Sequence, residues 1–334
     1  MCVIMAKKYK SNSSNSSKWF LYKIRDRNYN PIYKLKVKNN KNIETLFLTD
    51  HINKWSEGIN SNGLMIVSAA LDNHSDFEDN TRSSDISSIH KKNKSAMITL
   101  NNAIESSNIE EAKKILIDNR FVGTSFISDG DNLIILEIYV KDESYNREIK
   151  LLGSKIEKLS KAEQIIEVMK GIKDSDYDIA HQEVKNDITV IRTNHGKLLD
   201  KAGYQKKDKD KKGYTSSMFR YKITKEAIEK LDNIHPIEIL TILKNLKGIE
   251  KESQNNPIRA KVDLDKDGKQ PYYSTTIIML TSTGSMFAVP LEDDIDEDSK
   301  LRLKKDRKVN FILLPKNLSL FESFKSITYK NIID

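Results

Sequence analysis

The order of strand-forming and helix-forming segments constrains the fold of this sequence more than any other feature. Alternating or continuous runs of apolar and β-branched residues predict strands at 3–5, 19–27, 43–48, 63–71, 121–128, 132–140, 187–192, 272–280, 286–290 and 309–314. Apolar residues at helical spacing predict helices within 97–119, 158–172, 224–232 and 236–246. No linker separates these segments, so we expect one α+β domain over residues 1–334, with antiparallel sheets inside and helices outside.

Two of the expected strand pairs are specific. The segments 121–128 and 132–140 are joined by a turn around Gly130, which accepts a positive φ at little steric cost and therefore predicts a hairpin. The segment 43–48 is expected to pair with 63–71, which is almost continuously apolar and therefore predicted to be buried on both faces.

Two polar segments are predicted to be insertions in this domain. The segment 72–96 lacks periodicity for most of its length, which is typical either of a lid over a site or of plain disorder. The segment 205–213 is densely charged and is expected to be a solvated loop. Between them, the helical region 97–119 divides into two short helices, the second capped by Asn108.

The composition limits the partners and the compartment. The 334 residues carry 56 Lys and Arg against 48 Asp and Glu, a net charge of +8. Since the basic residues are interleaved with acidic ones, we do not expect a nucleic-acid partner. The sequence has neither a secretory signal nor an apolar run of the ~18 residues that a membrane span needs, so we expect a cytoplasmic protein without a membrane partner.

Metal and cofactor sites are not predicted. The chain has one cysteine, and its six histidines lack metal-ligand spacing. The segment 263–268 copies the opening of a calcium loop, but Ser274 stands where a bidentate carboxylate is needed, which favours a simple turn. Glycine-rich phosphate-binding loops are also missing from the sequence.

The single cysteine, Cys2, directly follows Met1. If Met1 is removed, the thiol and a free α-amine share one residue, and the amine, with an ordinary pKa of roughly 7.7–8.0, can exchange protons near neutral pH. The predicted strands 3–5 and 19–27 would pair across the polar run 11–17 and carry Cys2 and Arg25 side by side. The alternative is that a cysteine occurs at this position by chance, and other residues must decide between the two interpretations.

Acyl transfer by such a thiol needs a cation near the thiolate, an acceptor for the amine and donors for the oxyanion. Arg25 and Asp26 lie on the strand expected to pair with that of Cys2. Asn194 follows a buried strand, where side chains commonly project into a cleft, and Arg220 follows a turn that enters the next helix. His195 invites assignment as a general base, but the α-amine fills that role, so we predict that His195 is structural.

These residues resemble the motifs of the N-terminal-nucleophile hydrolases, in the group of choloylglycine hydrolases, penicillin V acylases and acyl-coenzyme A:6-aminopenicillanate acyltransferases. The resemblance spans most of the chain and is carried by Cys2 together with the segments 24–29 (IRDRNY), 58–64 (GINSNGL), 192–196 (RTNHG), 216–221 (SSMFRY) and 255–259 (NNPIR). It implies a four-layer αββα sandwich with the N-terminal residue in a cleft between two antiparallel sheets.

The resemblance also implies roles for individual residues. Cys2 would be the nucleophile and proton carrier, Arg25 would hold the thiolate, Asn194 would donate to the oxyanion, and Arg220 would anchor the network around the amine.

The sequence departs from the family pattern at two positions. The aspartate that accepts from the amine aligns with Asn28, which leaves Asp26 as its substitute. A second oxyanion asparagine aligns near Ala70, so that donor is absent or is replaced by Asn73 or a backbone N–H.

Together these observations predict a cysteine amidohydrolase that cleaves a non-peptide C–N amide bond of an N-acyl small molecule through a Cys2 acyl-enzyme. An acyltransferase that uses the same acyl-enzyme, and a non-catalytic structural or interaction protein of the same fold, are the alternatives. Proteins of the resembled group often form homo-oligomers, and the sequence leaves open whether this chain does.

Overall fold

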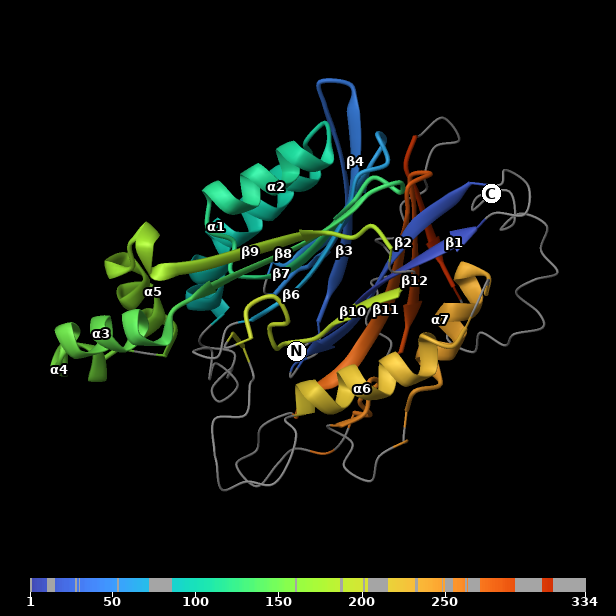
Figure 1. The fold of residues 1–334 in the computed structure, drawn as a ribbon. Helices are drawn as coiled ribbons and strands as arrows, with labels where there is room; N and C mark the ends of the chain where they lie inside the picture. The colour runs from blue at the N-terminus through green and yellow to red at the C-terminus, as the bar shows by residue number, and fades with distance from the viewer. Residues whose placement is uncertain are drawn as a thin grey trace.

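The computed structural model describes residues 2–10, 16–27, 29, 31–52, 54–71, 86–159, 161–186, 189–200, 202–203, 216–231, 234–247, 249, 255–261, 263, 271–291 and 308–314. These residues form two β-sheets, of six and seven strands, with helices on their outer sides (Figure 1).

The first sheet has the strand order β10-β1-β2-β11-β12-β13. Its strands are β1 (Cys2–Lys10), β2 (Ser17–Arg27), β10 (Thr189–Arg192), β11 (Tyr273–Thr281), β12 (Ser285–Pro290) and β13 (Asn310–Leu313). All neighbours are antiparallel except β12 and β13, which are parallel. The N-terminal strand therefore lies inside the sheet, paired on both edges.

The second sheet is an antiparallel meander in which strands follow one another in sequence order from β3 to β9. Its strands are β3 (Tyr33–Asn40), β4 (Ile43–Asp50), β5 (Ser56–Asn60), β6 (Met65–Ala69), β7 (Gly123–Ser128), β8 (Leu133–Val140) and β9 (Tyr177–Glu183). The outer strands β3 and β9 are much more exposed than those between them. Short connections join the strands from β3 to β6 and join β7 to β8, whereas helices lie between β6 and β7 and between β8 and β9.

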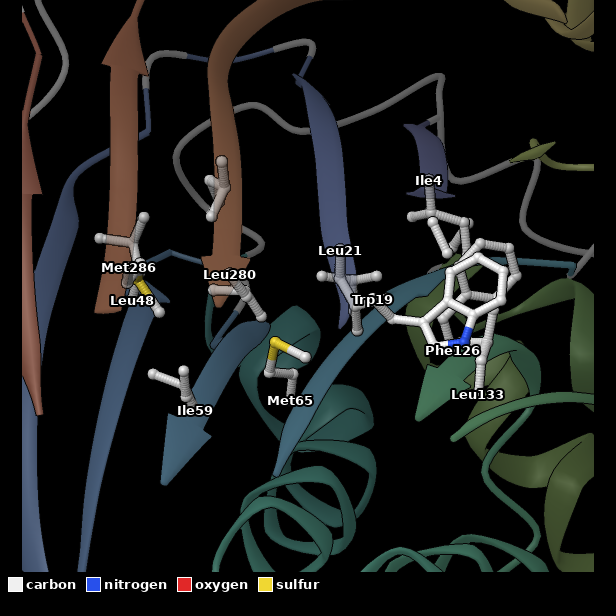
Figure 2. Packing of buried hydrophobic residues seen from close by; sticks show 14 of the residues in the cluster. Ile4, Trp19, Leu21, Leu48, Ile59, Met65, Phe126, Leu133, Leu280 and Met286 are labelled. Atoms are coloured by element: carbon white, nitrogen blue, oxygen red, sulfur yellow. The ribbon is translucent and has the colours of Figure 1, made fainter. Parts of the chain in front are cut away.

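The two sheets pack face to face through a core of buried side chains from both (Figure 2). Ile4 and Leu21 from the first sheet and Leu48, Ile59 and Met65 from the second all belong to this core. Since successive side chains of a strand point to opposite faces, alternate residues of each strand enter this core. Cys2 belongs to it and is therefore directed between the sheets.

Helices cover the outer face of each sheet (Figure 1). The α1 (Ile86–Ile104) and α2 (Ile109–Asp118) helices pack on the second sheet, whereas α6 (Ser216–Ile228) and α7 (Pro236–Lys244) pack on the first. The α3 (Asp142–Leu152), α4 (Ser154–Glu157) and α5 (Lys161–Gly171) helices and the 3₁₀ turn Asp174–Asp176 lie between β8 and β9 in the sequence. Two packed sheets with outer helices agree with the predicted α+β sandwich.

Several local predictions are confirmed. Cys2 is opposite Arg25 in the β1–β2 ladder, as the expected hairpin requires. Gly130 has a φ of 94° in the turn between β7 and β8, and the Asn108 side chain accepts a hydrogen bond from the Glu111 backbone N–H at the start of α2.

Other local predictions are wrong. The strands at 43–48 and 63–71 do not pair, because β5 lies between them. The segment 72–96 is not entirely a loop, since α1 begins at Ile86. Arg220 does not follow a turn but lies inside α6, which begins eight residues before the predicted helix start at Thr224. The segments 11–15, 72–85 and 204–215, and most of 263–268, lie outside the described residues.

Candidate functional site

Cys2 occupies the first position of β1, at the end of the inter-sheet core. Its side chain is buried, with 7% of the residue's surface exposed. Its backbone N–H donates a hydrogen bond of 2.8 Å to Oδ1 of Asn194, which follows β10. Two segments separated by 192 residues thus meet at the nitrogen that would become the α-amine in a chain starting at Cys2.

The side-chain amide of Asn194 is fixed from both ends. While Oδ1 accepts from Cys2, Nδ2 donates to the backbone oxygen of Ala70 at 2.8 Å. The Asn194 backbone N–H donates to Ser217 Oγ at 2.9 Å, which ties the residue to the first turn of α6. This arrangement defines which end of the amide faces Cys2.

Glu137 organises the loop that follows Asn194. This buried β8 carboxylate accepts hydrogen bonds of 2.9–3.1 Å from three consecutive backbone N–H groups, those of residues 197–199. It also forms an ion pair with Arg192 of β10 at 3.4 Å. An anion that accepts several backbone N–H bonds is a strong local anchor. The second sheet therefore holds the segment on both sides of Asn194.

His195 is part of this framework. Its Nδ1 lies 2.8 Å from Thr193 Oγ1 and 2.9 Å from Ser217 Oγ, and its ring contacts Tyr221 edge to face. Burial and the positive charges of Lys197 and Arg192 lower the pKa of His195 to about 4. The imidazole is therefore neutral at physiological pH, and the structural role of His195 stays a prediction.

Three cationic side chains line the inner face of β2. Lys23, Arg25 and Arg27 stand at alternate positions, and each is buried. Glu57 of β5 forms ion pairs with both Lys23 and Arg25, and Asp50 of β4 receives Nε of Arg27 at 2.6 Å. The second sheet thus supplies the carboxylates for a row of cations on the first.

Arg25 is directed mainly toward the second sheet. Besides its ion pair with Glu57, it donates to the Leu48 backbone oxygen at 2.7 Å and stacks over the Tyr33 ring, with 4.6 Å between the guanidinium carbon and the ring centre. The Tyr33 hydroxyl lies 2.6 Å from Thr275 Oγ1.

The thiol of Cys2 is activated by this surrounding charge. Burial raises the pKa of Cys2, but the ammonium of Lys23, the α-ammonium of Met1 and Arg27 lower it, while Asp26 opposes them. The net result is a pKa of about 6, compared with 9.0 for an ordinary cysteine. A thiolate, which is the nucleophilic form, therefore predominates at neutral pH.

Asp26 and Arg220 lie together on the opposite face of β2. Asp26 Oδ2 is 2.6 Å from Arg220 Nη2 and 3.8 Å from Arg259 Nη1, and its Oδ1 accepts from Ser274 Oγ at 2.7 Å. Strand alternation separates this outer group from Cys2, which shares the inner face with Arg25. The structure therefore unites Cys2, Arg25 and Asn194 on one side and Asp26 and Arg220 on the other.

Lys23 and Glu57 are site residues that none of the sequence motifs indicates. The available signal was the spacing of Lys23, Arg25 and Arg27, because three charges on one face of a strand flanked by aromatic and aliphatic residues require buried partners. Glu57 could not be assigned as that partner without knowing how the two sheets stack.

Other kinds of site find no support among the described residues. No group of three or more His, Cys, Asp or Glu side chains in this part of the chain could hold a metal ion. No described helix is long and apolar enough to cross a membrane. No family model matches the chain. A search of curated proteins finds no match either.

Proposed function

We propose that the protein is a cysteine amidohydrolase of the N-terminal-nucleophile type, with the αββα fold of that superfamily, acting on a non-peptide C–N amide bond of an N-acyl small molecule. One observation carries the proposal: Cys2 begins a strand between two sheets, and its nitrogen is hydrogen-bonded to Asn194 Oδ1. A structural cysteine does not need its backbone nitrogen at a converging set of polar side chains.

Cys2 supplies both the nucleophile and the base in this proposal. In the proposed mature form, which lacks Met1, the Cys2 nitrogen is an α-amine with an ordinary pKa of roughly 7.7–8.0. Asn194 Oδ1 already accepts an N–H from this atom, so it would orient the amine toward the sulfur of the same residue. The lowered pKa of the thiol supports its role as the attacking atom.

Asn194 would also donate to the oxyanion. A primary amide carries two N–H groups, and one of those on Asn194 is used by the Ala70 backbone oxygen. The proposal assigns the second to the tetrahedral intermediate, together with a backbone N–H. A fixed donor of this kind is effective because it costs no reorganisation when the charge develops.

The reaction then follows in two balanced steps. The Cys2 thiolate attacks the amide carbonyl, a C–S bond forms, the C–N bond breaks, and the leaving amine takes a proton from the Cys2 ammonium. Water, deprotonated by the Cys2 amine, attacks the thioester and releases the carboxylic acid and the thiolate. If an amine takes the place of water, the same site is an acyltransferase.

A non-catalytic protein of the same fold is the second candidate. The observation that favours it is the position of Asp26, which is engaged by Arg220 on the far face of β2 and does not reach the Cys2 nitrogen. The amine would then lack the carboxylate acceptor that the family resemblance implies.

Two measurements test the proposal. Intact-mass analysis of the purified protein should show a chain that begins at Cys2. Incubation with a panel of N-acyl amides and an acylating probe should then add one acyl group at Cys2, and Cys2→Ser and Cys2→Ala should abolish turnover while retaining the wild-type circular dichroism spectrum. Retention of Met1, or full turnover by Cys2→Ala, would refute the proposal. Thiol capture without turnover of any amide would favour the non-catalytic alternative.

A further inference from the structure

The inner face of β2 carries more positive than negative side chains. Lys23, Arg25 and Arg27 are cations, and the carboxylates that pair with them among the described residues are Glu57 and Asp50. All five are buried. Burying an uncompensated charge is costly, so such a cluster favours an additional anion or the loss of a proton.

We propose that Lys23, held by Glu57, is the counterion that keeps Cys2 ionised, so that the resting site is a thiolate–ammonium pair. Lys23 acts here as a positioning residue, because it sets the charge on the sulfur. The catalytic value of this pair rests on the proposed function, but its existence does not, since the ionisation of Cys2 is measurable without any substrate.

The strand register places Lys23 close to Cys2. Lys23 is opposite Ile4 in the β1–β2 ladder and Cys2 is opposite Arg25, so Lys23 and Cys2 are diagonal neighbours on the inner face. Such neighbours are separated by roughly 7–8 Å between Cα atoms, a distance that a lysine side chain can span. Glu57 and the Trp55 ring, whose centre is 5.9 Å from Nζ, limit where the ammonium can lie.

Arg25 is less suited to this role, although it is directly opposite Cys2. Its guanidinium is engaged by the Glu57 carboxylate, the Leu48 backbone oxygen and the Tyr33 ring, all of which belong to the second sheet or the segment leading into it. Because Glu57 accepts from both cations, Arg25 shares the carboxylate and leaves part of the Lys23 charge uncompensated. That remaining charge is available to Cys2.

The other charged groups near Cys2 and Lys23 raise some of the pKa values in this cluster and lower others. Arg27 lowers the pKa of the Cys2 thiol, whereas Asp26, on the far face of β2, raises it. Burial lowers the pKa of Lys23 to about 7; the Cys2 thiolate raises it and Arg25 and Arg27 lower it. Asp50 pairs with Arg27 and Tyr29, and the pKa values of Tyr29 and Tyr33 are raised, so both phenols stay neutral.

The titrations of the two groups depend on each other. Burial raises the pKa of Cys2, but Lys23 and the other nearby cations lower it to about 6, while the Cys2 thiolate raises the pKa of Lys23, which burial lowers to about 7. Each charge supports the other, and the two protons titrate as a coupled pair. Replacing Lys23 with a neutral side chain therefore removes the largest cationic influence on the thiol.

The ultraviolet absorbance of the thiolate near 240 nm measures this directly, because the chain has one cysteine. The difference between wild-type and Cys2→Ser spectra, titrated from pH 4.5 to 10, should show a midpoint near 6 in the wild type. In Lys23→Met the midpoint should move to 8.5 or above, so that the thiolate fraction at pH 7 falls roughly 30-fold. Lys38→Met, which removes an exposed lysine on β3, is the matched control and should leave the midpoint unchanged.

The double variant Lys23→Met/Glu57→Gln guards against loss of folding in the single variant, because it removes one positive and one negative charge together. It should raise the midpoint by less than Lys23→Met alone, because Arg25, released from Glu57, stays opposite Cys2. A wild-type midpoint above 8, or a folded Lys23 variant with a midpoint within half a pH unit of the wild type, would overturn the inference. A midpoint near 6 in a protein that forms no acyl-enzyme would leave this pair intact and refute only the proposed function.

Discussion

Neutralising Asp26 should destabilise the fold strongly, because this carboxylate compensates buried positive charge. Its Oδ2 is 2.6 Å from Arg220 Nη2 and 3.8 Å from Arg259 Nη1, and each of the three side chains is fully buried. In Asp26→Asn the neutral amide keeps the shape of the side chain and an oxygen for Ser274, but it removes the negative charge. Any loss of stability is then caused by the removal of the charge and not by a cavity.

The size of the effect follows from the geometry. Removing one partner of a buried ion pair typically costs about 3–5 kcal/mol, because the other charge is left uncompensated. The retained hydrogen bond with Ser274 Oγ places Asp26→Asn toward the lower end, at about 3 kcal/mol. Since domains are commonly stable by about 5–15 kcal/mol, the variant should still fold while unfolding at a clearly lower urea concentration.

Urea unfolding followed by tryptophan fluorescence measures this loss. Asp178→Asn is the control, since Asp178 forms a largely exposed ion pair with Lys141 at 3.7 Å and its replacement should cost less than about 1 kcal/mol. The double variant Asp26→Asn/Arg220→Met should cost less than the sum of its single changes, because the two side chains interact directly.

A cost below about 1 kcal/mol for Asp26→Asn would contradict this reasoning. If that stable variant also lost turnover, Asp26 would act on the Cys2 amine, as the resemblance implies, rather than through the outer charge group.

Three further predictions concern the site. Asn194→Ala should lower turnover by roughly 10²–10³-fold through loss of an oxyanion donor, while a kinetic assay of Cys2 alkylation shows that the thiol remains reactive; an unchanged turnover would exclude Asn194 from catalysis. The stability of the wild type should rise between pH 6 and 9, because the unfolded thiol keeps a proton that the folded Cys2, with its pKa of about 6, has lost. This contribution to the free energy of unfolding is fully present above pH 9 and is lost as the pH falls toward 6. Urea unfolding at pH 6.5 and 8.5 should therefore give a smaller change in the free energy of unfolding for Cys2→Ala than for the wild type. An equal change in both proteins would contradict the lowered pKa. Glu137→Gln should lower the free energy of unfolding by about 1.5–3 kcal/mol, since a neutral amide binds the three N–H groups of residues 197–199 less strongly. If this variant unfolds at the wild-type urea midpoint, the anchor is dispensable for stability.

The parts of the fold that could be predicted from sequence are those whose signal is local. Gly130 and Asn108 identify a turn and a helix start through their own backbone and side-chain chemistry, and both are confirmed. The strands β3, β5 and β9 were missed. The first and last are exposed edge strands, which have no fully apolar face and depend on hydrogen bonds to a neighbouring strand. β5 is short and contains a buried glutamate, so its pattern looks polar although it is central.

The contacts of the candidate site also divide into those that a local sequence signal predicts and those that it does not. The pairing of Cys2 with Arg25 follows from hairpin geometry, because the two strands are joined by one short polar segment. The contact between Cys2 and Asn194 joins positions 192 residues apart, and only the motif resemblance indicates it before the fold is known. The Lys23–Glu57 pair depends on how two sheets stack, which no local pattern encodes.

The two faces of β2 explain how one strand serves both a reactive site and a stabilising charge group. Arg25 faces Cys2 and the second sheet, whereas Asp26 faces the helices that cover the first. A bulge in β11 extends this division, because the ladder passes from Ser274 opposite Asp26 to Thr276 opposite Arg25 and leaves Thr275 as the extra residue. Ser274 thereby binds the outer carboxylate while Thr275 binds the inner Tyr33 hydroxyl. A one-residue slip of β2 would exchange the two faces and place Asp26 beside the thiol, where its charge would raise the thiol pKa, so the register of this strand determines the reactivity of Cys2.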